Sequence, residues 1–235
     1  MKNILLFLLI IIISSCSRAD ENATLPEPEL SEYQIDVIDY FKAVALGFEF
    51  GDASRITRKW NSDMNIFTEG EPSTELMNEL NEIILEINDL ATDGFQINIV
   101  DQSSQSNYHI FFGTGTEYAQ SYPSQTNFVD ANWGLFSVYW NAQNEFTTGH
   151  MYVDISRANL TEQKHLLREE LTQSLGLARD SQRYLESIFQ SAWTSTTDYA
   201  EIDRDLIRLL YHPDLNIGLN ENRVEEVLRE ILINE

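Results

Sequence analysis

The stretch that decides the fold spans residues 169–180 and reads Glu169-Glu170-Leu171-Thr172-Gln173-Ser174-Leu175-Gly176-Leu177-Ala178-Arg179-Asp180. A helix is predicted from about Thr161 to Leu175, because Gly176 is a typical helix terminator. Residues four apart on a helix project from one face, about 6 Å apart along the axis. Glu169 and Gln173 are therefore expected to point into one cleft, with Glu170 about 100° round the helix.

The same segment resembles the zinc-binding helix of metzincin-type metallopeptidases. In those enzymes two His four residues apart bind zinc, and the Glu after the first His is the general base. A Gly then ends the helix before a third His. Glu170 falls on the general-base position, Gly176 on the helix-ending Gly and Asp180 on a trailing Asp. The three ligand positions instead hold Glu169, Gln173 and Arg179. The resemblance thus implies a zincin-like fold whose zinc ligands are replaced, and no zinc site is predicted.

A wider resemblance is to a family of bacterial exported proteins of unknown function, DUF2927, which is metzincin-like in layout. The similar stretches are Ala45–Gly51 (ALGFEFG), Lys59-Trp60, Glu169–Leu177, Ser187-Ile188-Phe189, Leu210–Leu215 (LYHPDL) and Gly218-Leu219. They span roughly residues 40–220 in the same order. Arg179 stands where such sequences more often have Asn, and Leu219 where they more often have Met. The resemblance implies fold and location but no reaction.

Hydrophobic periodicity outlines the remaining elements. Helices are predicted at Ser31–Leu46, with a Ser31/Gln34 capping box, and at 74–91, with Ser73 as the cap. Further helices are predicted near 198–210 and 221–233. Strand-like runs lie at Ile56–Thr68, Phe95–Val100, Tyr108–Phe112, Gly134–Trp140 and Phe146–Ile155, with a turn at 141–145. We therefore predict an α+β, zincin-like fold: a twisted mixed sheet backed by helices 74–91 and 161–175, with a helical C-terminal part.

The N-terminus predicts the location. Met1-Lys2-Asn3 precedes ten unbroken apolar residues, Ile4–Ile13, which suit a signal peptide and are too short to cross a bilayer. Ile13-Ser14-Ser15-Cys16 resembles the bacterial lipobox, which implies that Cys16 is lipidated, with palmitate as an expected acyl chain, and becomes the mature N-terminus. The predicted organisation is a lipoprotein signal peptide at 1–15, a flexible acidic tether at 16–30 and a single zincin-like domain at 31–235. That domain divides into a sheet-plus-helices part, 31–176, and a helical part, 177–235.

The amino-acid composition limits the kinds of partner that the protein is expected to bind. The 235 residues include 38 acidic and 15 basic side chains, for a net charge of −23, which disfavours nucleic acid as a ligand. Cys16 is the one cysteine, so an internal disulfide and a Cys-rich zinc site are excluded. The expected partner is a membrane, reached through lipidated Cys16. The expected location is the bacterial cell envelope, anchored to the outer membrane and facing the periplasm or the surface.

Other candidate residues have a functional and a structural interpretation. The His residues, His109, His150, His165 and His212, are scattered. His165 lies one turn before Glu169, and His150 is expected either to line the cleft or, by preference, to be a solvated surface residue. The aromatic run 133–140 suggests sugar stacking or capture of a peptide edge by a cleft strand. Because its residues alternate between two faces, the preferred interpretation is that at least one face lies in the core. No serine has the surroundings of a nucleophile, and adjacent Glu169 and Glu170 diverge too far for an acid/base pair across one bond.

These observations predict a lipid-anchored, metzincin-like protein that binds a peptide or cell-envelope component in its cleft without zinc catalysis. The alternative is an active hydrolase with a non-standard metal site. It would use Glu169, Gln173 and Asp180 or His150, with Glu170 as general base. Carboxylate and amide oxygens would suit a hard cation such as calcium better than zinc.

Arg179 leads to one further prediction. A guanidinium at the position of a third zinc ligand could pair bidentately with Glu169 or Glu170. We therefore predict that Arg179, or another cation, takes over the electrostatic role of the metal.

Overall fold

The computed structural model describes residues 29–235. The predicted signal peptide, Cys16 and nearly all of the predicted tether lie outside this range. Among the described residues, no helix is both long enough and apolar enough to cross a membrane.

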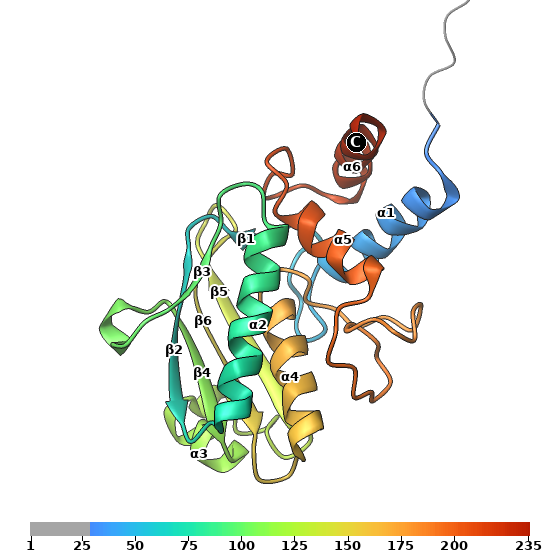
Figure 1. Cartoon of the computed structure of the whole chain (residues 1–235). Helices are drawn as coiled ribbons and strands as arrows, with labels where there is room; N and C mark the ends of the chain where they lie inside the picture. The colour runs from blue at the N-terminus through green and yellow to red at the C-terminus, as the bar shows by residue number, and fades with distance from the viewer. Residues whose placement is uncertain (1–28) are drawn as a thin grey trace, which may run out of the picture.

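A mixed sheet of six strands forms the centre of the molecule (Figure 1). Its strands are β1 (Lys59–Trp60), β2 (Met64–Gly70), β3 (Ile97–Ile99), β4 (Tyr108–Gly113), β5 (Gly134–Trp140) and β6 (Glu145–Asp154). The order β1-β6-β4-β2-β3 is parallel throughout, and β5 pairs antiparallel with β6. The turn between β5 and β6 places Asn144 at φ 65°, a conformation that Asn tolerates. Within residues 29–235, β5 pairs with β6 alone, so its other edge is free of any strand from this part of the chain.

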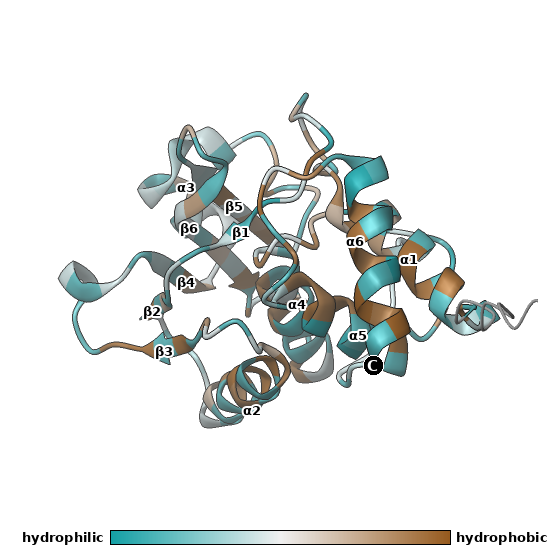
Figure 2. Cartoon of the chain, turned by 90° about the horizontal axis from the view of Figure 1, so that it is seen from above, coloured by the Kyte–Doolittle hydropathy of each residue, from teal (hydrophilic) through white to brown (hydrophobic). Residues whose placement is uncertain are grey.

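Two helices, α2 (Thr74–Leu90) and α4 (Leu160–Gln173), cover one face of the sheet (Figures 1 and 2). On α2 the residues at spacings of three and four, Leu76, Leu80, Ile83 and Ile87, are buried. Ser73 caps α2 as predicted, and a capping box at Asn159 begins α4. The predicted zincin-like arrangement, a mixed sheet backed by these two helices, is confirmed.

Three further helices, α1 (Glu32–Ala45), α5 (Glu201–Leu210) and α6 (Glu221–Asn234), pack together at one end of the molecule (Figures 1 and 2). The predicted Ser31/Gln34 capping box is present. The helical part is thus not purely C-terminal, because α1 buries its apolar stripe against α5 and α6. Residues 177–200 contain no helix.

Short elements differ most from the sequence-based expectation. The strand-like run 56–68 divides into β1 and β2. Helix α3 (Gly115–Ser121) and the 3₁₀ turns Ser103–Gln105 and Pro123–Gln125 were not predicted. Segments of one or two turns are too short to display a hydrophobic period, so sequence alone does not reveal them.

Candidate functional site

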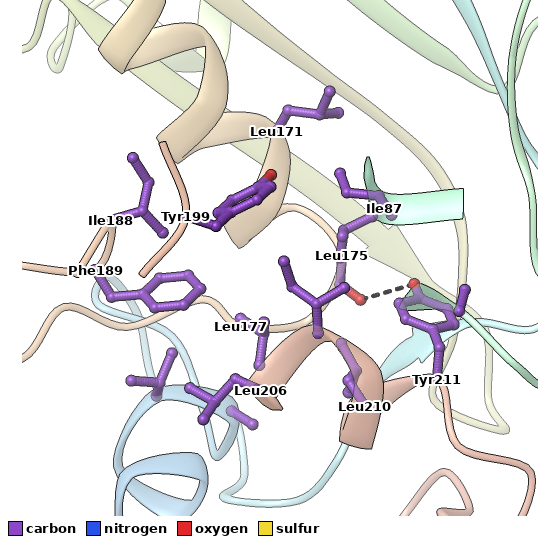
Figure 3. Close-up of a cluster of buried hydrophobic side chains, with 14 of the residues drawn as sticks. Ile87, Leu171, Leu175, Leu177, Ile188, Phe189, Tyr199, Leu206, Leu210 and Tyr211 are labelled. Atoms are coloured by element: carbon purple, nitrogen blue, oxygen red, sulfur yellow. Dashed lines mark hydrogen bonds between the residues drawn. The ribbon is translucent and has the colours of Figure 1, made fainter. Parts of the chain in front are cut away.

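The C-terminal end of α4 is fixed from several sides. Gly176 adopts φ +125°, and a Cβ there would lie 2.1 Å from the carbonyl oxygen of Arg58, so only glycine fits. The Trp60 indole donates to the carbonyl of Ser174 at 3.0 Å, and the Tyr211 hydroxyl donates to that of Leu175 at 3.1 Å (Figure 3). These contacts satisfy carbonyls that the end of a helix leaves without partners. The stretches 59–60 and 210–215 that resemble the family are therefore structural, and they position the polar face of α4.

The Ser187-Ile188-Phe189 stretch takes part in a second buried network, which consists of hydrogen bonds. Ser187 donates to the carboxylate of Asp203 at 2.5 Å and is bonded to the Tyr40 hydroxyl at 2.8 Å. The same carboxylate accepts the backbone N–H of Ile188 at 3.0 Å. No His completes this group, so Ser187 is a structural hydroxyl that ties the 181–190 segment to α5.

The cleft has a volume of about 1120 Å³ and lies where α4 meets β5. One wall is the whole run from Trp133 to Trp140, and segments 48–53 and 190–193 form others. Gly134 allows the close approach of helix and strand. A Cβ at this position would lie 2.8 Å from Glu170 Oε1 and 3.0 Å from Leu166 Cδ2.

The lining of the cleft is strongly acidic. Its carboxyl groups belong to Glu49, Asp52, Glu162, Glu169, Glu170 and Asp180. Among the described residues that line the cleft there is no Lys or Arg, and His165 is the single basic side chain. Glu169, Glu170 and Gln173, which the sequence singled out, all reach this cleft. The structure thus brings the candidate site residues together without a permanent positive charge.

His165 and Glu169 form the expected pair on one helix face. His165 Nε2 lies 3.3 Å from Glu169 Oε2, and Nδ1 lies 2.7 Å from the carbonyl oxygen of Thr196. Although burial opposes it, the hydrogen bond and charge of Glu169 raise the pKa of His165 above its usual value. The pair offsets part of the negative charge at one side of the cleft.

Glu170 is in the opposite situation. Its side chain is 9% exposed and forms no ion pair with any residue in the range 29–235, and the backbone N–H of Phe136 on β5 is the hydrogen-bond donor beside it. Burial, then the charges of Glu169, Asp180 and Glu49, raise its pKa well above the usual value. The nearby backbone N–H of Phe136 offsets this rise in part. These surroundings favour the protonated form of the Glu170 carboxyl.

Asp180 and Glu49 complete the group of interacting carboxyls. Asp180 Oδ1 accepts a hydrogen bond of 2.6 Å from the Gln173 amide. Burial and the charges of Glu169 and Glu49 raise the pKa of Asp180 to about 7. Burial and the charge of Glu169 also raise the pKa of Glu49. The amide of Gln173 thus partners Asp180 and not a metal.

The prediction for Arg179 is wrong as far as pairing is concerned. Arg179 is half-buried and does not line the cleft, and its Cδ lies 3.8 Å from the point where a Cβ on Gly47 would stand. Within the described part of the chain it forms no ion pair with Glu169 or Glu170. The turn after Gly176 directs the side chain toward the 47–55 loop, where Gly47 leaves space, and the carboxyls keep their mutual repulsion.

The two interpretations of His150 are both wrong. This residue lies on β6, is 4% exposed and does not line the cleft. Its ring stacks on Tyr122 at 3.7 Å between centroids, and Nδ1 is 2.5 Å from the Tyr118 hydroxyl. Burial, then the charge of His109, lowers its pKa to about 4. Tyrosines of α3 and its flank, which sequence alone did not locate, bury His150 as a neutral residue.

The donor set does not fit zinc. Over residues 29–235, no three His, Cys, Asp or Glu side chains converge closely enough to hold a metal ion. A guanidinium such as that of Arg179 is not a metal ligand, and zinc prefers nitrogen and sulfur donors to an amide. His109 and His212 lie elsewhere, near Glu69 and Asp214.

Aromatic side chains surround the acidic floor. Phe50 and Phe128 approach each other at 5.8 Å between ring centroids, and Trp133 meets Trp193 edge-on at 5.5 Å. Exposed aromatic side chains at the rim are Phe50, Phe128, Tyr139, Trp140 and Trp193. On β5, Leu135 packs into a small cluster with Tyr118 and Tyr152, and Val138 packs into the main core, so both strand faces are packed.

Sequence reasoning did not assign Glu49, Gly134 or Trp193 to the site. Glu49 sits in the stretch Gly47-Phe48-Glu49-Phe50-Gly51, where an acidic residue between aromatics and glycines was an available signal. Gly134 and Trp193 gave none, because their role depends on which elements face each other.

Comparison with known proteins bears on the fold and the family. The profile "Protein of unknown function (DUF2927)" matches residues 34–230, and the chain belongs to this family. A search of curated protein sequences finds no significant match.

Solved structures similar to this chain include two of myroilysin. "Structure of myroilysin" matches with a TM-score of 0.41 and 12% identity, over 67% of this chain and 97% of the other. "Crystal structure of myroilysin" matches with a TM-score of 0.42 and 12% identity, over 80% of this chain and 99% of the other.

Proposed function

We propose that this member of the DUF2927 family is a lipid-anchored protein of the bacterial cell envelope whose cleft binds an extended peptide, or a peptide-bearing envelope component, without zinc-dependent hydrolysis. The anchor is lipidated Cys16, and the domain faces the periplasm or the cell surface. Support for the anchor and the location comes from the lipobox-like sequence at 13–16.

The free edge of β5 is the observation that carries the binding proposal. Asp154 N–H donates to the Trp133 carbonyl at 2.7 Å, and Leu135 and Ser137 continue this pairing with β6. By the antiparallel alternation, Phe136 and Val138 direct their backbone N–H and C=O groups away from β6. An extended peptide can add to such an edge as a further strand, with backbone hydrogen bonds for affinity and side-chain pockets for selectivity.

The absence of zinc catalysis follows from the chemistry of the donors. A zinc-bound water reaches a pKa near 7 because the metal withdraws charge. Of the three residues at the ligand positions only Glu169 carries a group that zinc ordinarily binds, because Gln173 is an amide and Arg179 a guanidinium. Burial and the neighbouring carboxyls raise the pKa of Glu170 and so favour its protonated form, which cannot accept a proton from water. The cleft offers the edge of β5 to a peptide, and within residues 29–235 no group of side chains converges to hold a metal that would activate water.

Peptide binding is tested with the purified mature lipoprotein in detergent. Fluorescence anisotropy measures its affinity for short peptides and for versions methylated on alternate backbone nitrogens. Strand addition predicts that methylating one alternating set weakens binding about tenfold or more, while the other set has little effect. Equal effects of both sets, or no binding of any peptide, would contradict the proposal.

The second candidate is a hydrolase with a non-standard metal, or with a hard cation such as calcium, and Glu170 as base. It is favoured only by the convergence of Glu169, Glu170 and Asp180 in one cleft. Elemental analysis of the purified protein separates the two candidates. One bound metal per chain, together with chelator-sensitive peptide hydrolysis that Glu170→Gln abolishes, would establish the hydrolase.

A further inference from the structure

We propose that the cleft is selective for peptide segments that carry basic side chains, and that a Lys ammonium or Arg guanidinium is bound between Glu170, Glu169, Asp180 and Glu49. This inference rests on the proposed function and adds the chemical class of the ligand.

The charge of the lining is the first observation. Six carboxyl groups line the cleft, whereas no Lys or Arg side chain in the described range does. A cleft lined by charges of one sign, with low-dielectric walls, concentrates ligands of the opposite sign. The structure therefore attracts cationic groups to this cavity and repels acidic peptides.

Glu170 is the second and independent observation. A buried carboxyl is normally hydrogen-bonded or paired with a cation. Elsewhere in the molecule this holds: buried Glu79 is paired with Arg168 at 2.9 Å and Lys164 at 3.1 Å. Glu170 is comparably buried and faces the cleft, yet its neighbours are the Phe136 N–H and other carboxyls, and no cation within residues 29–235 pairs with it. A cation entering from the cleft would complete its surroundings as Arg168 completes those of Glu79.

A basic side chain suits the shape of the site better than a bare metal ion. In the part of the chain that the structure describes, no three acidic or His side chains stand close enough together to hold a metal. A Lys or Arg side chain carries its charge on a flexible apolar stem and places several hydrogen-bond donors among separated acceptors. The aromatic rim, with Trp133 and Trp193, offers surfaces on which such stems and cations pack. A peptide along β5 would hold its backbone at the rim, with a basic side chain reaching down to Glu170.

The titration behaviour gives this arrangement a measurable consequence. The groups facing Glu170 are Glu169 on α4, Asp180 and Glu49 on the neighbouring loops and the Phe136 N–H on β5, while His165 offsets Glu169. A bound cation stabilises the ionised form of these carboxyls, so binding near neutral pH must release protons.

The experiment compares labelled peptides in which every second residue is Lys with matched peptides that carry Gln or Glu at those positions. The protein is the full mature lipoprotein. We expect the Lys peptide to bind at least about tenfold more tightly than the Gln peptide at low salt, with the difference shrinking at high salt. The Glu peptide is expected to bind most weakly. Calorimetry in buffers of different ionisation enthalpy should show release of roughly one proton on Lys-peptide binding.

Two exposed glutamates provide a matched pair of variants. Glu49→Gln removes a carboxylate at the cleft, and Glu82→Gln removes one from the exposed surface of α2, with the same change in net charge. Glu49→Gln should lower the preference for Lys over Gln peptides about threefold, whereas Glu82→Gln should leave it unchanged. Glu170→Gln should lower the preference for Lys over Gln peptides further and should remove most of the proton release on Lys-peptide binding.

The outcomes separate this inference from the proposed function. If Lys and Gln peptides bind equally and both depend on their backbone N–H groups, the inference is overturned and the peptide-binding function stands. If no peptide binds, both fail. If Ca²⁺ alone binds stoichiometrically and blocks the Lys peptide, the cleft is a cation site and the inference is also overturned.

Discussion

Helix α4 carries two buried charged residues, Arg168 and Glu170, and they lie in contrasting regions. Arg168 faces α2, is 2% exposed and donates to Glu79 at 2.9 Å and to Glu86 at 3.0 Å. Its guanidinium also lies 4.5 Å above the ring of Tyr199. Glu170 faces β5 and the cleft, where other carboxyls are its neighbours.

The two sides of α4 thus differ in how their buried charged groups are paired. At the α2–α4 interface the fold pairs buried Arg168 and Glu79 with opposite charges, which is the usual condition for burying an ion. At the cleft the fold collects like charges, and no cation within residues 29–235 pairs with Glu170. A protein tolerates such an arrangement at a site of function more readily than in its scaffold. The contrast within one helix is why we assign the cleft face, and not the α2 face, to ligand binding.

The largest effect is expected from removing the paired charge. Arg168→Met should lower the free energy of unfolding by about 3 kcal/mol, because buried Glu79 keeps only Lys164 as a partner. Urea denaturation measures this change in the free energy of unfolding. The control Arg223→Met breaks an exposed ion pair with Glu226 and should change stability by about 0.5 kcal/mol or less. A small effect of Arg168→Met would remove the contrast between the two faces.

The next effect concerns the spacing between α4 and the cleft wall. Gly134→Ala places a Cβ 2.8 Å from Glu170 Oε1 and 3.0 Å from Leu166 Cδ2, so these side chains must leave their positions at the cleft. We expect a loss of about 2 kcal/mol in stability and weaker peptide binding. Gly94→Ala is the control for a glycine with no neighbour within 4 Å, although its φ of +97° adds strain of its own. If Gly134→Ala left both properties unchanged, close packing of β5 on α4 would not shape the cleft.

A smaller and pH-dependent effect is expected at Asp180. The pKa of Asp180 is about 7 in the folded protein and near 3.8 when unfolded, so its contribution to stability is present in acid and is lost as pH rises through 7. Asp180→Asn keeps a side-chain oxygen that accepts the hydrogen bond from Gln173. It also removes the loss of stability that accompanies a rise in pH. The variant should exceed the wild type by about 1–2 kcal/mol near pH 8 and match it near pH 4.

Glu170→Gln should change stability in the same direction, because burial and the neighbouring carboxyls raise the pKa of Glu170. Denaturation series across the pH range test both variants. A variant less stable than the wild type at high pH would mean that the carboxylate has a stabilising partner.

The smallest effect separates binding from stability. Glu49→Gln at the exposed edge of the cleft should alter the free energy of unfolding by less than about 0.5 kcal/mol. Thermal melting of this variant beside Glu82→Gln checks that its reduced preference for basic peptides comes from the cleft and not from a damaged fold. A clear loss of stability in Glu49→Gln alone would show that this carboxylate has a structural role.

Much of the fold could be read from local patterns. The apolar spacing of α2, the Ser31/Gln34 box and Gly176 at the end of α4 each depend on residues a few positions apart, and each is confirmed. The orientation of Glu169 and Gln173 toward one cleft also followed from helix geometry, whereas that of Glu170, about 100° round the helix, did not. The association of α1 with α5 and α6 did not, because it joins segments more than a hundred residues apart.

The sequence by itself determined the helical face that carries Glu169 and Gln173, and the replacement of the three His that zinc would need. These are properties of residue type and helical period. The tertiary structure alone decided that Arg179 turns toward Gly47, that α3 covers His150, and that Glu170 meets other carboxyls instead of a cation. The reason is physical. The sequence specifies the charge of each side chain, but the electric field at that side chain is the sum of contributions from neighbours that only folding brings near.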